Sequence, residues 1–179
     1  MKVVGFVGTS GSGKTTVITQ VVGRLADTGL RVAVLKHARH GFDMDRPGKD
    51  SYRVREAGAV QVLVASRERW VLLGEHPDLL EEPSLDMMLR RFDASALDLV
   101  LVEGFSHEHY PKIEVYRAAH GKPPRCWPHD PDVIALATDT PMDGGAVPRL
   151  DMNAPLEVTQ FVLDYLLLPT VLSPPVEAR

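Results

Sequence analysis

Gly8-Thr9-Ser10-Gly11-Ser12-Gly13-Lys14-Thr15 is the stretch that decides the fold, because it matches the phosphate-binding pattern G-x-x-x-x-G-K-[ST]. The short apolar run Val3–Val7 precedes it and predicts a strand buried on both faces of a parallel sheet. An amphipathic pattern begins at Thr15 and ends at Gly29, where a helix end favours a left-handed residue. A strand, a glycine-rich loop and a helix are the context that the motif requires, so the segment predicts a P-loop rather than a turn that merely starts a helix.

The rest of the chain predicts an α/β fold. Arg31–Lys36 predicts a second strand, which completes a βαβ unit with a right-handed crossover. A long loop is expected over His37–Gly48. Further strands are expected over Val60–Val64, Trp70–Leu73, Leu97–Glu103, Lys112–Tyr116 and Val133–Thr138, and further helices over Lys49–Gly58, Ser84–Phe92 and Ala154–Leu167, the last capped by Asn153.

These elements define one predicted architecture. It is a P-loop NTPase-like three-layer sandwich with a mostly parallel sheet, into which an antiparallel strand pair is inserted at about residues 59–74. We expect a single nucleotide-binding domain over residues 1–168 and a flexible tail over residues 169–179.

Composition narrows the class of ligand. The chain has 179 residues and a formal net charge of −4, so it has no long-range attraction for a nucleic acid. Its one cysteine, Cys126, excludes an intramolecular disulfide and fits a reducing compartment. Met1–Val7 is too short for a signal peptide, and no later apolar run is long enough to cross a bilayer. We therefore expect a cytoplasmic protein that binds a small anion.

The P-loop predicts the chemistry of that anion. Glycines let backbone N–H groups curl around phosphate oxygens in conformations that a Cβ would disfavour. Lys14 is expected to reach the β and γ phosphates, and the Thr15 hydroxyl to bind Mg²⁺ that bridges them. The remaining predicted contacts of this loop are Thr9, Ser10, Gly11, Ser12 and Gly13.

Three acidic residues and one lysine outside the loop are further candidates. Glu103 ends a buried strand, where P-loop proteins commonly place a carboxylate near magnesium, and we assign it a catalytic role with Lys14. Asp43 and Asp45 lie on the loop after the second strand and either is a candidate for the metal; the alternative is a solvated turn. Lys36 ends that strand, where it is either a phosphate contact or a surface lysine.

Histidines and arginines offer weaker signals. The histidines and Cys126 do not show the paired ligand spacing of structural zinc. An arginine could grip an anionic substrate or act as a finger across a dimer, although each could equally be a solvated surface residue. These arginines are Arg39, Arg46, Arg53, Arg55, Arg67 and Arg69.

Taken together, these motifs resemble the molybdopterin-guanine dinucleotide biosynthesis protein B family over nearly the whole chain, to about Leu168. The matching segments are Gly8–Thr16, Val34–His37, Phe42–Ser51, Arg55–Ala59, Val64–Ser66, Leu101–Phe105, Pro111–Val115 and Ala135–Asp139. The run Arg39-His40-Gly41-Phe42 departs from the histidine-rich run that many members have before the acidic loop.

The resemblance implies a P-loop fold of the SIMIBI type, a homodimer, magnesium-dependent GTP binding and slow hydrolysis. It implies two partners, the molybdenum cofactor guanylyltransferase and molybdopterin or its guanine dinucleotide. Carried over by motif, the phosphate and magnesium residues are Gly11, Gly13, Lys14, Thr15 and Thr16, with Asp45 and Glu103 at the metal, Lys36 nearby and Asp139 as a candidate for the base. Guanine specificity comes from the resemblance alone, because the chain has no Asn-Lys-x-Asp signature.

The predicted function is therefore a GTP-binding adapter that assists attachment of GMP to molybdopterin and is a weak GTPase. One alternative is an ATP-dependent small-molecule kinase or ligase, whose substrate Lys36 and the arginines would hold. Another is a structural dimeric module that the nucleotide only rigidifies.

Overall fold

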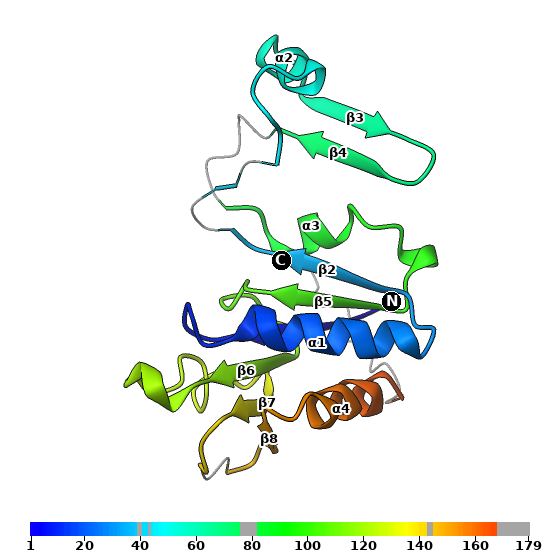
Figure 1. The fold of residues 1–179 in the computed structure, drawn as a ribbon. Helices are drawn as coiled ribbons and strands as arrows, with labels where there is room; N and C mark the ends of the chain where they lie inside the picture. The colour runs from blue at the N-terminus through cyan, green and yellow to red at the C-terminus, as the bar shows by residue number, and fades with distance from the viewer. Residues whose placement is uncertain (39–40, 43, 76–81, 143–144, 168–179) are drawn as a thin grey trace, which may run out of the picture. The chain divides into compact units, whose positions relative to one another are not determined.

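A computed structural model describes residues 1–38, 41–42, 44–75, 82–142 and 145–167 (Figure 1). The chain forms two compact units, one of Met1–His37 with Ser84–Arg179 and the other of Ala38–Pro83. The predicted tail at 169–179 lies outside the described residues, as do Arg39, His40 and Asp43. No helix within the described ranges is both long and apolar enough to cross a membrane.

The first unit is built on a six-stranded sheet of order β2-β5-β1-β6-β7-β8, and all of its strand pairs are parallel. The strands are β1 (Lys2–Val7), β2 (Val32–Lys36), β5 (Leu99–Glu103), β6 (Lys112–Tyr116), β7 (Val133–Thr138) and β8 (Arg149–Asp151). The predicted parallel sheet with the first strand in its interior is confirmed. Strand β8 was not predicted, because three residues with only Leu150 buried carry no recognisable alternation.

Two long helices cover one face of this sheet. Helices α1 (Lys14–Asp27) and α4 (Pro155–Leu167) pack beside each other on it (Figure 1). Helix α1 ends as predicted, since Gly29 has φ of 85° and the N–H of Leu30 bonds back to the Leu25 carbonyl. Helix α4 begins one residue later than expected. The core on this face includes Val4, Phe6, Val17, Val21, Leu25, Leu101, Ile113, Val158 and Val162.

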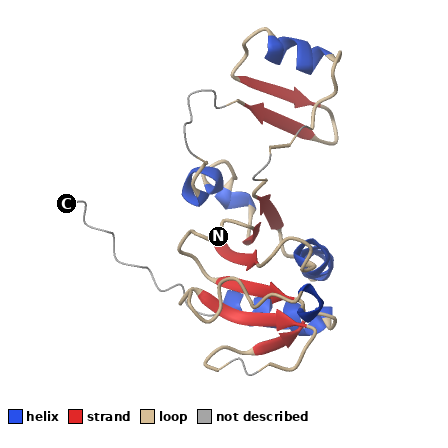
Figure 2. Ribbon diagram, turned by 90° about the vertical axis from the view of Figure 1, so that its left-hand side faces the viewer, coloured by secondary structure: helices blue, strands red, loops and turns tan. Residues whose placement is uncertain are grey.

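Short elements and loops cover the opposite face, so the unit has three layers (Figure 2). Helix α3 (Leu85–Leu89) and the 3-10 helix η1 (Ala94–Ala96) lie there, and Leu85 packs with Val100 and Val102. Ser84 caps α3 by accepting the N–H of Met87, as predicted. The α-helix stops before the expected Phe92, because the N–H groups of Arg91 and Phe92 bond to carbonyls three residues back, those of Met88 and Leu89.

The second unit contains helix α2 (Asp50–Glu56) and a two-stranded antiparallel sheet, β3 (Gln61–Ala65) with β4 (Trp70–Gly74). The Ser66 hydroxyl closes the turn between the strands by accepting the N–H groups of Glu68 and Arg69. The predicted antiparallel pair is confirmed. The unit extends beyond the expected insert at 59–74, because α2 packs against β3.

Candidate functional site

The loop between β1 and α1 has the backbone that a phosphate cradle requires. Gly8, Gly11 and Gly13 have φ of 132°, 80° and 97°, which side-chain-bearing residues rarely adopt. A Cβ at Gly8 would also collide with the backbone carbonyl of Val115 on β6. Helix α1 starts at Lys14, so its N-terminal N–H groups face the loop and favour an anion.

Lys14 already lies in this cradle. Its Nζ donates hydrogen bonds to the carbonyl oxygens of Gly8, at 3.0 Å, and Thr9, at 2.6 Å. Burial lowers the pKa of the Lys14 ammonium, the nearby cations Arg125 and Lys36 lower it further, and the carboxylate of Glu103 opposes them. An anion in the loop would offer this ammonium charged acceptors in place of two neutral carbonyl oxygens.

Glu103 links the ends of β2 and β5 to the start of helix α1 at this site. The Thr15 hydroxyl donates to both Glu103 carboxylate oxygens, at 2.9 and 3.0 Å, and the Lys36 Nζ lies 3.4 Å from Oε1. Lys36 and Glu103 are register partners in the β2–β5 ladder, which explains why residues far apart in sequence meet. Only 12% of the Glu103 side chain is exposed, so its charge acts with little screening by solvent.

A sharp turn directly after β5 holds Glu103 in place. Gly104 has φ of 105°, and a Cβ there would come within 2.9 Å of the His37 Cβ. Phe105 has φ of 50°, a rare conformation for a bulky residue, and its ring stacks on His37 at a centroid distance of 4.4 Å. The Tyr110 hydroxyl donates to the Gly104 carbonyl, and burial raises the pKa of this phenol well above its usual range.

These groups surround a cavity of about 370 Å³. Its lining is Ser10, Gly11, Gly13, Lys14, Thr15, Thr16, Lys36 and Glu103. These groups fit a phosphate chain with its metal ion. Backbone N–H groups and two ammonium groups can bind the phosphate charge, and a hydroxyl and a carboxylate can serve as hard oxygen ligands for Mg²⁺. The structure thus brings together most of the residues that the motif selected.

The other predicted site residues lie elsewhere. Ser12 is buried, and within the described part of the chain its hydroxyl has no hydrogen-bond partner. Asp45 belongs to the second unit, where its carboxylate accepts the Ser51 hydroxyl at 2.9 Å and lies 3.7 Å from Arg55. Asp139 follows β7 and pairs with Arg117 at 3.3 Å. The role of Asp45 at a metal and the role of Asp139 at the base of the nucleotide stay predictions.

Sequence reasoning missed the residues that flank the loop on the β6 side. Arg117 and His120 border its glycines, and Arg125 influences Lys14. Arg117 directly follows a parallel strand, at the sheet edge where such folds bind ligands, and that position is the signal that could have identified it.

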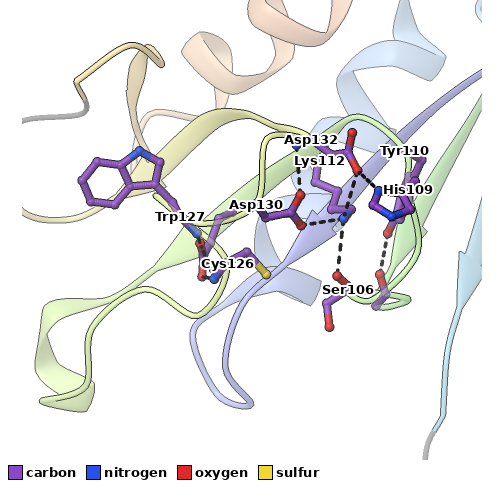
Figure 3. Close-up of polar contacts among 10 residues, drawn as sticks. Ser106, His109, Tyr110, Lys112, Cys126, Trp127, Asp130 and Asp132 are labelled. Atoms are coloured by element: carbon purple, nitrogen blue, oxygen red, sulfur yellow. Dashed lines mark hydrogen bonds and ion pairs between the residues drawn. The ribbon is translucent and has the colours of Figure 1, made fainter.

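Buried charges on β6 hold the polypeptide that covers this flank (Figure 3). Lys112 is 1% exposed and its Nζ lies 2.6 Å from Asp130 and 3.8 Å from Asp132, which also bonds His109. Burial raises the pKa of the Asp130 carboxyl, but the hydrogen bonds from Lys112 and the Asp132 N–H, with the nearby positive charges, together outweigh burial and lower the pKa. Glu114, also on β6, accepts the backbone N–H groups of residues 125, 126 and 127. A loop thereby replaces a helix over this part of the sheet.

Comparisons with known proteins identify the family to which this chain is similar. The family model of molybdopterin guanine dinucleotide synthesis protein B (MobB) matches residues 3–139. The molybdopterin-guanine dinucleotide biosynthesis adapter protein of Escherichia coli strain K12 is 43% identical over 161 residues, which cover 90% of this chain and 91% of that protein. Its Haemophilus influenzae counterpart is 40% identical over 163 residues, covering 90% and 88%. The crystal structure of a MobB homolog from Bacillus stearothermophilus matches with a TM-score of 0.67 and 25% identity, covering 93% of this chain and 98% of that one.

Proposed function

We propose that this chain is a GTP-binding adapter of molybdenum cofactor biosynthesis, because it belongs to the molybdopterin guanine dinucleotide synthesis protein B (MobB) family. In this role it assists the attachment of GMP to molybdopterin, which forms molybdopterin-guanine dinucleotide. The observation that carries the proposal is the convergence of Lys14, Thr15 and Glu103 on one cavity beside a glycine cradle.

Magnesium completes the proposed site. Thr15 and Glu103 would hold the ion, directly or through its water shell, and the metal role of Asp45 stays a prediction from the sequence. When bound, the ion neutralises charge on the β and γ phosphates. The residues of this chain keep their own tasks, since Lys14 binds phosphate oxygens and Lys36 orients the Glu103 carboxylate.

The proposed hydrolysis of GTP is slow. Among the described residues, those that line the cavity include neither a glutamine to position water nor an arginine to stabilise the transition state. Both Glu103 oxygens accept the Thr15 hydroxyl, so this carboxylate is better placed to hold a metal than to activate water. We expect fewer than about one turnover per second for the purified protein, and faster turnover would contradict the adapter role.

The proposed partners are the molybdenum cofactor guanylyltransferase, molybdopterin or its guanine dinucleotide, and a second copy of the chain. The hairpin of β3 and β4 supports the homodimer. Leu63 pairs with Leu72 across the hairpin, and Trp70 lies on the same side of it by strand alternation. These side chains are 63%, 44% and 69% exposed, an unusual amount of apolar surface for a free hairpin. We place the protein in the cytoplasm, where the one thiol of this chain, Cys126, would stay reduced.

A calorimetric titration tests the proposed function. GTP, ATP and their non-hydrolysable analogues are titrated into the protein with Mg²⁺, beside Lys14→Ala and the exposed control Lys122→Ala. We expect a clear preference for GTP, with affinity at least about 100-fold lower in Lys14→Ala and unchanged in the control. A preference for ATP would favour the kinase or ligase instead, and an undiminished affinity in Lys14→Ala would remove the cavity as the site.

A further inference from the structure

The arrangement of the phosphate cavity determines where the rest of a nucleotide must lie. Thr15, Lys36 and Glu103 form its metal end, at the tips of β2 and β5. In the sheet order, β6 and β7 lie on the opposite side of β1. A nucleotide whose terminal phosphates point to the metal end therefore extends its nucleoside over the ends of β6 and β7.

The segment after β6 lies directly against the P-loop on that side. A Cβ added at Gly11 would come within 3.0 Å of the His120 ring, at Cε1. A Cβ added at Gly13 would lie 3.5 Å from the Arg117 guanidinium, at Nη2. The segment includes the 3-10 helix η2 (Ala118–His120), which ends at Gly121 with φ of 64°. Glycine in the P-loop is thus what lets this segment approach.

Asp139 holds the Arg117 guanidinium in this position. Its Oδ2 lies 3.3 Å from Arg117 Nη1, and its Oδ1 accepts the backbone N–H of Ala118 at 3.1 Å. One carboxylate from the end of β7 therefore engages both the side chain and the backbone that follow β6. The Arg117 side chain is 36% exposed, so part of it remains accessible to a ligand.

We propose that Arg117 contacts the nucleoside half of the nucleotide and that Asp139 is its positioning residue. The inference rests on the proposed nucleotide binding at the P-loop. A guanidinium is a planar, delocalised cation that stacks on aromatic rings and donates several hydrogen bonds, so it suits a purine base. Asp139, which the resemblance suggested for the base, acts here through Arg117.

The experiment separates a nucleoside contact from a phosphate contact. GTP, GDP and inorganic tripolyphosphate are titrated with Mg²⁺ into the wild-type protein, Arg117→Ala and the neighbouring control Lys122→Ala. We expect Arg117→Ala to weaken GTP and GDP about tenfold, while tripolyphosphate stays within about twofold of wild type. An equal loss for tripolyphosphate would make Arg117 a phosphate ligand and overturn the inference, as would no loss for GTP.

A double-mutant cycle tests the positioning role. Asp139→Asn alone is expected to weaken GTP severalfold without affecting tripolyphosphate, and to cause no further loss in the Arg117→Ala background. An undiminished loss in that background would mean that Asp139 contacts the base itself. Unchanged thermal unfolding of each variant confirms that the loop still folds. Lys14→Ala should lose both GTP and tripolyphosphate, so failure of the P-loop site is distinguishable from failure of this inference.

Discussion

Glu103 illustrates how one residue can hold a site ready for a metal. Its carboxylate accepts the Thr15 hydroxyl and pairs with Lys36, which keeps the oxygens at the mouth of the phosphate cavity. Magnesium would take over these oxygens and the hydroxyl, while Lys36 would remain beside them.

Glu103→Gln should therefore abolish most of the effect of magnesium on GTP binding. An amide keeps the shape but is a poorer ligand for a hard cation, so we expect the affinity gained with Mg²⁺ to fall by about tenfold or more. Affinity measured with a chelator should not fall. Titration with and without Mg²⁺ checks this, with exposed Glu157→Gln as control, and an unaltered magnesium response would exclude Glu103 from the metal site.

Cys126 gives a second prediction at the scale of one residue. The thiol is 8% exposed and packs with Val7 and Val133, and burial raises its pKa, with the Glu114 charge adding to this effect. A raised pKa leaves less thiolate at any given pH. Iodoacetamide should therefore alkylate the folded protein far more slowly than the urea-unfolded protein between pH 7 and 8.5, a range that ends at the ordinary thiol pKa of about 8.5. Equal rates in the two states would show that the loop over β6 opens freely.

The motif found the central site residues because the P-loop is a local pattern with fixed spacing. Lys14 and Thr15 follow from eight consecutive positions, and Glu103 from its place at the end of an apolar run. No such motif includes Arg117, and its position directly after a predicted strand was its only signal. Its place depends on how β6 lies beside β1 and on a carboxylate that follows a different strand.

Among the elements, β6 departs most from what its sequence predicts. A strand in the interior of a parallel sheet is expected to be apolar, yet Lys112 and Glu114 are each 1% exposed. Both side chains find partners in the covering loop, Lys112 at Asp130 and Glu114 at backbone N–H groups. Polar residues at alternate positions predicted the strand but not its burial, because the partners come from a loop without periodicity.

Glu114→Gln should destabilise the protein by about 2–3 kcal/mol, because it removes a charged acceptor and turns an amide N–H₂ toward backbone donors. The Cys126 and Trp127 N–H groups, now at 3.0 and 2.7 Å from the carboxylate, would lose their charged partner. Urea unfolding measures the change, with Glu157→Gln expected to alter stability by at most about 0.5 kcal/mol. If the two variants were equally stable, the loop would not depend on Glu114.

At the scale of the whole molecule, the two compact units carry different features. The unit that contains the sheet holds the phosphate cavity, and Ala38–Pro83 carries the hairpin with its exposed apolar side. Two apolar runs on either side of a polar turn predicted both strands of the hairpin. It could not show that α2 joins them in one unit, because that association depends on packing between segments.

Dimerisation through the hairpin is testable by sedimentation equilibrium. Leu63→Glu should convert a dimer into a monomer at micromolar concentration, because a buried carboxylate at that position would find no partner opposite Leu72. Arg67→Ala, in the turn, should leave the dimer intact. A wild-type chain that is monomeric at this concentration would remove the homodimer from the account.

The central claim is that nucleotide bound at the P-loop enables the chain to assist formation of molybdopterin-guanine dinucleotide. The most direct measurement is the amount of this dinucleotide formed by the purified guanylyltransferase from molybdopterin and GTP with Mg²⁺, with this chain or its Lys14→Ala variant added. We predict that the wild-type chain increases product formation and that Lys14→Ala, folded to the same degree, does not. Equal stimulation by both would contradict the account and make the chain a structural module whose P-loop is dispensable.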